Sequence, residues 1–185
     1  MTRSSAALVR HSPTEQRTTV SSRPTPGTYS LDPARTTIEL RAKHMFGLAG
    51  VRATFQLTSG EVVVAEPWSA STARAVIDAS SFRSGNPTRD EHVQQPKFLD
   101  VERYPEIVVD LASADLGAGT ATGTLTAHGV TRPLQVDVEE FTADSDGLVL
   151  RGTARVDRYE HGLTASKGLA GRWMTLAITA TAVRR

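Results

Sequence analysis

The chain has 185 residues, of which 39% are hydrophobic, 5% aromatic and 22% charged. This composition suits one soluble domain with a buried core. No apolar run approaches the length of about 18 residues that a transmembrane helix needs. The absence of cysteine excludes disulfides, thiolate metal ligands and a cysteine nucleophile. The formal net charge is +1, to which residues 1–26 contribute +3 and residues 27–185 contribute −2. The remaining body is mildly acidic, so we do not expect nucleic-acid binding.

The first 26 residues are rich in Ser, Thr, Arg and Pro. Such a segment buries too little apolar surface to offset the entropy of ordering. Its longest apolar run covers only residues 6–9, whereas the apolar region of a secretory signal has about 7–15 residues. We therefore expect a disordered tail over residues 1–26, one domain over 27–185 and a cytoplasmic protein.

Apolar and polar residues alternate with a period of two from Thr37 onward, which is typical of strands with one face in water. In the first such segment Ile38, Leu40, Ala42 and His44 share one face. The last segment, about 173–183, is apolar on both faces apart from its threonines. In the segments between them, the residues expected to face inward are Val51, Ala53, Phe55 and Leu57, then Ala73, Ala75 and Ile77, then Ile107, Val109 and Leu111, then Leu134, Val136 and Val138, and finally Leu148, Leu150, Ala154 and Val156.

Turn residues such as Ser59-Gly60 and His128-Gly129 separate these segments, which gives about eight strands at close spacing. Residues 86–100 lack the alternation, and Asn86 or Thr88 could cap a short helix that Pro96 ends. The pattern predicts an all-β fold, either a sandwich or a closed antiparallel barrel, with one short helix inserted around 86–100. Many of the inward residues are alanines, which favours a barrel with room for a ligand.

Four sequence blocks resemble the YceI-like proteins, which are bacterial lipocalin-like barrels associated with polyisoprenoid binding. The blocks occur in the family's order over about 27–183, nearly the whole domain. They are Tyr29–Ile38, Lys43–Gly47 with Gly50–Phe55, Arg89–Val93 with Lys97–Val101 and Tyr104–Ile107, and Gly123–Leu134. The resemblance implies an eight-stranded antiparallel lipocalin-like β-barrel whose apolar tunnel holds a long isoprenoid chain. It brings no catalytic residues.

The chain departs from the family at one motif. Where the family tends to have Arg-x-Asp-aromatic-Gly, this chain has Arg158-Tyr159-Glu160-His161-Gly162. A histidine in place of the aromatic residue makes the local lining more polar, if it faces the interior. We expect no signal sequence, which would be a second departure, because many relatives are exported.

Three polar residues are candidates for contact with a ligand headgroup. His44 shares the inward face of its strand, and its imidazole can donate or accept a hydrogen bond. Arg89 can donate two hydrogen bonds to phosphate oxygens from its planar guanidinium. His92 lies near Arg89 on the helical segment. Purely structural roles remain open, with His44 as a buried residue bonded to backbone and Arg89 paired with a carboxylate.

The aromatic residues of the predicted barrel either fill its core or line a tunnel, and the sequence does not separate these two cases. The apolar ligand-binding candidates are Phe46, Phe55, Ile77, Phe82, Phe98 and Trp173. The histidines show no metal-ligand spacing, the glycines no phosphate-binding loop and the serines no nucleophile elbow. We therefore predict neither a metal nor a cofactor.

The sequence thus predicts a non-catalytic protein that binds and carries or sequesters an elongated apolar lipid, such as a polyprenyl phosphate or an isoprenoid quinone. Two alternatives stay open. One is a barrel enzyme that pairs Asp90 with His44 or His92 for acid–base chemistry on a small apolar substrate. The other is a filled barrel that serves as an interaction module in the form of a homodimer.

Overall fold

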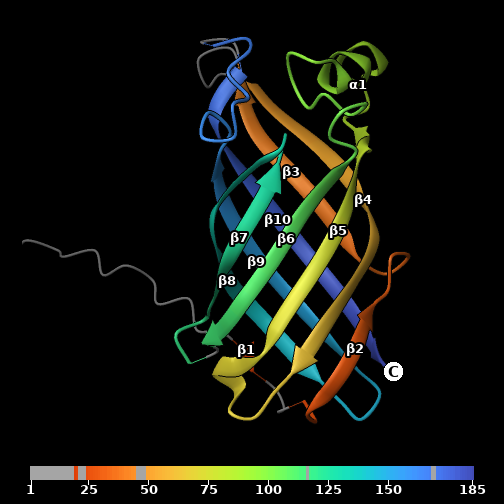
Figure 1. The fold of residues 1–185 in the computed structure, drawn as a ribbon, viewed down its shortest axis with the longest axis vertical. Coiled ribbons are helices and arrows are strands. Elements are labelled where there is room, and N and C mark those ends of the chain that lie inside the picture. The colour runs from red at the N-terminus through yellow and green to blue at the C-terminus, as the bar shows by residue number, and fades with distance from the viewer. Residues whose placement is uncertain (1–18, 21–23, 45–48, 116, 168–169) are drawn as a thin grey trace, which may run out of the picture.

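Eight strands close into an antiparallel barrel in the part of the chain that the computed structural model describes, which is residues 19–20, 24–44, 49–115, 117–167 and 170–185 (Figure 1). Each strand pairs with the next along the chain, and the last pairs with the first, so the eight strands leave no open edge between them. In chain order they are β3 (Thr37–His44), β4 (Ala49–Val64), β5 (Thr72–Arg83), β6 (Glu106–Asp115), β7 (Thr120–Ala127), β8 (Val130–Ala143), β9 (Gly147–Asp157) and β10 (Ala170–Arg184). The predicted eight-stranded antiparallel barrel is confirmed.

Two further short strands join this barrel. β2 (Gly27–Leu31) pairs with β4 and β10, so it continues β3 along the same position of the barrel wall. Between β2 and β3 the chain leaves the ladder, and Thr181 bridges the break. The amide of Asp32 donates to the Thr181 carbonyl at 2.8 Å, and the Thr181 hydroxyl donates to the Arg35 carbonyl at 3.1 Å. β1 (Thr19–Val20) lies parallel to β8.

The predicted alternation places the apolar residues inside, because successive side chains of a strand point to opposite faces. Ile38, Leu40 and Phe55 are at most 8% exposed, whereas Arg41 and Arg52, at outward positions of the same two strands, are exposed. Adjacent strands match these positions, since Ile38 lies opposite Phe55 and Leu40 opposite Ala53. The inward face read from the sequence is therefore the inward face of the barrel.

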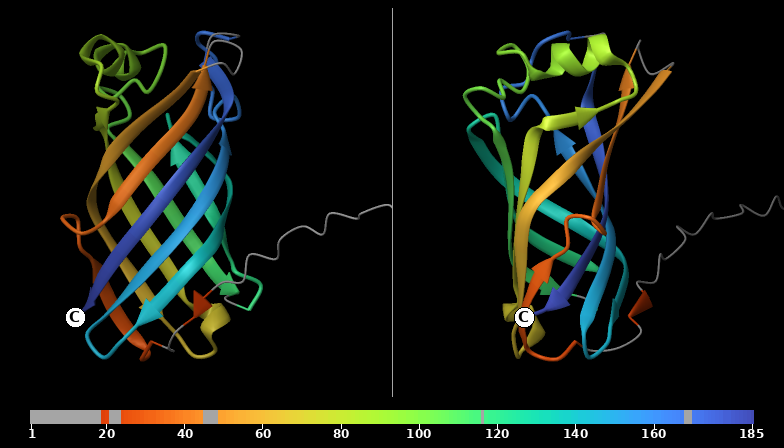
Figure 2. Two further views of the ribbon diagram at one scale, coloured as in Figure 1. Left: turned by 180° about the vertical axis from the view of Figure 1, so that it is seen from behind. Right: turned by 90° about the vertical axis from the view of Figure 1, so that its right-hand side faces the viewer.

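The short helix predicted within 86–100 is confirmed as α1 (Pro87–Gln94), which lies across one end of the barrel (Figures 1 and 2). The Asn86 side chain caps it by accepting from the Arg89 amide at 3.1 Å. Asp90 is nearly buried and accepts from the amide and hydroxyl of Ser84 at 2.9 and 2.6 Å, which ties the helix to the end of β5. A 3₁₀ turn, η1 (Trp68–Ala70), lies at the opposite end.

Most of the predicted tail lies outside the described residues, so its disorder stays a prediction. At its end, however, Thr19–Val20 pairs with β8 and Pro24 is buried. The hydroxyl of the fully buried Tyr29 donates to the Thr25 carbonyl at 2.7 Å. The helices found among the described residues are too short or too polar to cross a membrane.

Candidate ligand-binding site

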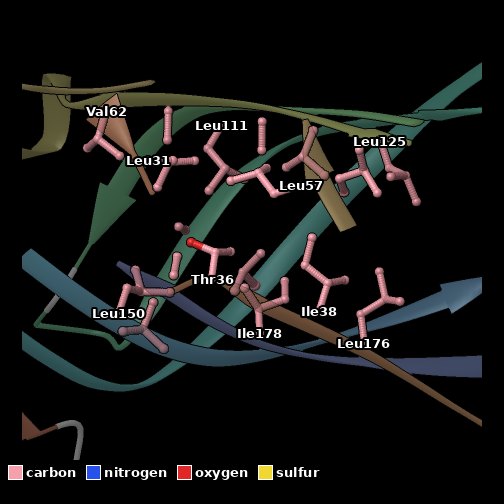
Figure 3. Close-up of a pocket in the computed structure, with 18 of the residues that line it drawn as sticks. Leu31, Thr36, Ile38, Leu57, Val62, Leu111, Leu125, Leu150, Leu176 and Ile178 are labelled. Carbon is pink, nitrogen blue, oxygen red and sulfur yellow. The ribbon is translucent and has the colours of Figure 1, made fainter. Parts of the chain in front are cut away.

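An apolar cavity of about 210 Å³ runs along the barrel interior, and we call it the tunnel (Figure 3). A single water molecule needs only about 10–15 Å³, so the barrel is hollow. Every strand from β3 to β10 contributes lining residues. They include Ile38, Leu40, Phe55, Leu57, Ala75, Ile77, Val109, Leu111, Ala121, Leu125, Val136, Val138, Leu150, Val156, Met174, Leu176 and Ile178. Small side chains such as Ala75 and Ala121 at inward positions leave the space that larger residues would fill.

The end of the tunnel away from α1 is aromatic. Trp68 of η1 meets Phe141 of β8 edge to face, with ring centroids 5.4 Å apart. Both residues line the tunnel, together with Pro24 and Val64. Residues of this end therefore offer a ligand apolar surface and no charge.

A second cavity of about 480 Å³ lies at the α1 end, and we call it the vestibule. It shares five lining residues with the tunnel, so the two spaces adjoin. The shared residues are Leu40, Phe55, Leu99, Leu163 and Met174. The rest of the vestibule wall comes mainly from α1, from the loop after it and from the chain between β9 and β10.

The vestibule differs from the tunnel in charge. Lys43, Arg89, His92 and Arg158 line it, and no carboxylate does so among the described residues. The structure shows no ion pair between Arg89 and any carboxylate in the described ranges; its backbone amide, not its guanidinium, bonds to Asn86. Arg89, which has no carboxylate partner among the described residues, favours an anionic group in this space.

Arg158 is the most deeply placed of these cations, at 5% exposure. Its guanidinium donates to the carbonyls of Leu163, Ala165, Ala170 and Gly171. Burial lowers the pKa of Arg158, while the charges of Tyr159 and Asp157 act in the opposite direction. The carbonyl oxygens thus replace the lost water, and one side chain fixes the rim, by which we mean residues 158–167 and 170–171.

Asp157, next to Arg158, belongs to the outer side of the same rim. Arg172 donates through Nε to Asp157 Oδ2 at 2.7 Å, and the Tyr159 amide donates to Oδ1 at 3.0 Å. The hydrogen bond from Arg172 lowers the pKa of Asp157 below its usual 3.8, against the opposing effect of burial. Arg172 therefore balances the charge of Asp157, and Asp157 does not line the vestibule.

His161, the residue that departs from the family motif, lies in the tunnel wall and is 3% exposed. Its Nδ1 is 3.0 Å from the Val130 carbonyl, and because a carbonyl only accepts, Nδ1 carries the proton. The His161 carbonyl in turn accepts from Nδ1 of His128 at 3.3 Å. His128 has φ of 52°, the left-handed turn geometry expected before Gly129.

The structure brings most of the sequence-predicted site residues to the two cavities. Phe55 and Ile77 line the tunnel, and Phe55 also reaches the vestibule. Phe82 meets Phe55 edge to face at 5.4 Å between centroids. The vestibule wall contains Phe82, Arg89, His92 and Phe98. Their role in binding a ligand stays a prediction.

Three predicted residues are not placed in a cavity wall. Phe46 lies outside the described residues. His44 ends β3 opposite Ala49, and its side chain is likewise outside what is described. Trp173 differs from the expectation, because it is 46% exposed on the outer face of β10. Its neighbour Met174 occupies the inward position, and the guanidinium of Arg155 stacks on the Trp173 ring at 4.2 Å.

Of the two acid–base pairs of the enzyme alternative, Asp90–His44 lies outside what is described, and in the other pair Asp90 and His92 each have other partners. Asp90 is bonded to Ser84. His92 is exposed, and its Nε2 lies 3.3 Å from Lys97 Nζ. Reasoning from sequence also missed Arg158 and His161 as buried wall residues, although the family motif had drawn attention to both positions.

Comparison with known proteins agrees with the fold. The sequence pattern of the YceI-like domain matches residues 29–182. A UPF0312 protein of Vibrio campbellii is 32% identical over 120 residues, and this match spans 61% of each chain. Among solved structures, BcnA of Burkholderia cenocepacia has a TM-score of 0.73 at 17% identity, over 82% of this chain and 98% of that one. A polyisoprenoid binding domain from Saccharophagus degradans has a TM-score of 0.67 at 18% identity, over 85% and 98%.

Proposed function

Since the chain belongs to the YceI-like domain family, we propose that it binds a long isoprenoid lipid, with the apolar chain in the tunnel and an anionic headgroup in the vestibule. One observation carries this proposal above all. An apolar tunnel adjoins a vestibule that is lined by four basic residues and, among the described residues, by no carboxylate. This polarity matches an amphiphile with a hydrocarbon tail and a negative head.

The tunnel can supply the binding free energy without specific contacts. Each CH₂ group that leaves water contributes about 0.8 kcal/mol, so a few isoprene units outweigh the cost of confining the ligand. Branched methyl groups also suit a wall made of Leu, Ile and Val side chains with gaps at Ala75 and Ala121. The wall therefore selects for an apolar chain and the tunnel depth for its length.

The vestibule favours a phosphate over a quinone as the headgroup. A quinone has no charge to match Lys43, Arg89 and Arg158, whereas a phosphate takes bidentate hydrogen bonds from arginine. Arg89 is the best placed of them, because the described structure gives its guanidinium no ion pair and it lines the vestibule. The name of the Saccharophagus degradans domain, a polyisoprenoid binding domain, supports an isoprenoid tail. We infer carriage or sequestration without catalysis, because the apolar tunnel and the basic vestibule suit the binding of an amphiphile.

Organic extraction of the protein purified without added lipid tests this function. The extract is compared by mass spectrometry with a mock purification from the same host. We expect one polyisoprenoid phosphate in near-stoichiometric amount. If the extract contains a quinone instead, the proposal for the tail in the tunnel stands and the proposal of an anionic headgroup is wrong. An extract that matches the mock sample from two unrelated hosts would contradict the whole proposal.

Variants of vestibule residues separate the contribution of the headgroup to affinity from that of the tail. Arg89→Ala is expected to lower the affinity for a polyprenyl phosphate by about tenfold or more, the loss of one charge-assisted hydrogen bond. The affinity for the corresponding uncharged polyprenol should stay unchanged. Arg74→Ala is the matched control, because Arg74 lies on the outer surface in an ion pair with Asp110.

A further inference from the structure

The outer surface of the barrel beside the vestibule carries an aromatic side chain among arginines. Trp173 is 46% exposed on β10. The guanidinium of Arg155 lies 4.2 Å from the Trp173 ring centroid, and that of Arg172 lies 5.5 Å from it. Among the described residues, Trp173 is the most exposed of the large hydrophobic side chains, and it lies beside two arginines.

Strand register extends this surface into a row of cations. Thr175, two residues beyond Trp173 on the same face of β10, lies opposite Arg155 of β9 on one side and Arg41 of β3 on the other. Arg41 in turn lies opposite Arg52 of β4. The four strands run side by side in the view from behind (Figure 2). We call Arg41, Arg52, Arg155, Arg172 and Trp173 the arginine–tryptophan face.

This face adjoins the vestibule through the alternation of the strands. Ala42, Val51 and Met174 line the vestibule. Each is the chain neighbour of a member of the face, namely Arg41, Arg52 and Trp173, whose side chains point outward. The face and the vestibule are thus the outer and inner sides of the same short stretch of wall.

Two of the four arginines of this face have a carboxylate partner in an ion pair, and two do not. Arg41 is paired with Glu39 at 2.5 Å, and Arg172 with Asp157 at 2.6 Å. Arg52 and Arg155 have no ion pair with a carboxylate in the described part of the chain. Unpaired arginines around a half-exposed tryptophan suit the boundary between lipid headgroups and water, where the ring lies at headgroup level and the cations meet phosphates.

We propose that the arginine–tryptophan face docks the protein on an anionic lipid membrane, with the vestibule at the contact. This inference builds on the proposed function, because a lipid that moves between bilayer and tunnel needs a short path. Docking through this face would keep the lipid tail close to the bilayer as it enters. Docking does not require a lipid already bound in the tunnel, so the docking proposal and the lipid-binding proposal can fail separately.

Sedimentation with vesicles tests the docking. The full chain is mixed with vesicles of phosphatidylcholine alone, or of phosphatidylcholine and phosphatidylglycerol in equal parts. We expect binding to the second kind only, reduced by added salt, with a blue shift of tryptophan emission. Trp173→Ala should abolish the shift and weaken binding, and the remaining tryptophan, Trp68, lies at the far end of the barrel.

Arg52→Gln and Arg155→Gln should each lower the vesicle partition coefficient about fivefold, the effect expected for one cation at an anionic surface. Arg74→Gln removes the same charge from another side of the barrel and should leave partitioning nearly unchanged. Equal losses in all three variants would show non-specific attraction and overturn the proposal. So would the absence of binding to anionic vesicles, and if extraction still yields a lipid, the proposed function stands without this docking surface.

Discussion

Replacing Arg158 tests whether one buried cation holds the rim of the vestibule. Arg158→Met removes the donor from four carbonyl oxygens that the guanidinium now satisfies. Charge-assisted hydrogen bonds contribute about 1.5–3 kcal/mol each. Part of this is offset, because the burial that lowers the pKa of Arg158 also makes its charge costly. We expect a loss of about 3–5 kcal/mol in the free energy of unfolding, against a typical total of about 5–15 kcal/mol.

Urea unfolding followed by circular dichroism measures this loss, with the midpoint and the slope fitted separately. Arg158→Lys keeps the charge but has three donors on a flexible stem, so an intermediate loss is expected. Arg155→Met is the exposed control, with a loss below about 1 kcal/mol from the cation–π contact with Trp173. If Arg158→Met is within about 1 kcal/mol of the parent, the carbonyls do not depend on the guanidinium and the reasoning is wrong.

Three more changes test other parts of the structure. Gly123→Ala should cost about 1–3 kcal/mol in unfolding free energy, because its Cβ would overlap the carbonyl oxygen of Asp110 on the neighbouring strand. Asp157→Asn should reduce the loss of stability in acid. The pKa of Asp157 is lower in the folded state, so its contribution is present above the unfolded pKa and disappears as pH falls through the folded pKa. Ala121→Phe should fill part of the tunnel and shorten the longest lipid chain that the protein retains.

Each of these changes has its own control and its own contrary result. Gly50→Ala has no atom within 4 Å of the new Cβ, so a cost equal to that of Gly123→Ala would contradict the steric argument. If the free energy of unfolding of Asp157→Asn falls with acid as steeply as that of the parent, another carboxylate is responsible for the loss of stability. Thr122→Phe places the same side chain at the neighbouring, exposed position, and it should not change the length of the retained chain.

The strand pattern of this barrel could be predicted because the inward positions of its strands are mostly apolar. Ile38, Leu40 and Ala42 alternate with Glu39, Arg41 and Lys43, so the period of two assigns each side chain to one face. The direction of Trp173 could not be predicted in this way. The final strand is apolar at successive positions, and the choice between Trp173 and Met174 for the interior depends on register with β3 and β9.

Arg158 and His161 show a second limit. A charged or polar side chain near a turn is normally exposed, and nothing local in the sequence reveals that distant carbonyls will surround it. The partners of Arg158 come from the following loop and from the start of β10, and His161 bonds to Val130 at the start of the neighbouring strand β8. Likewise, the division into tunnel and vestibule depends on how α1 lies over the barrel end, which sequence alone does not specify.

The contrast between the two ends of the cavity has a kinetic consequence. With its head among the basic residues at the α1 end and its tail directed toward Trp68 and Phe141, a bound lipid would leave head first and withdraw its tail last. Each further methylene withdrawn into water would slow departure about fourfold. Residence time would thus rise steeply with chain length, and rapid release would require a second apolar phase that receives the tail as it emerges.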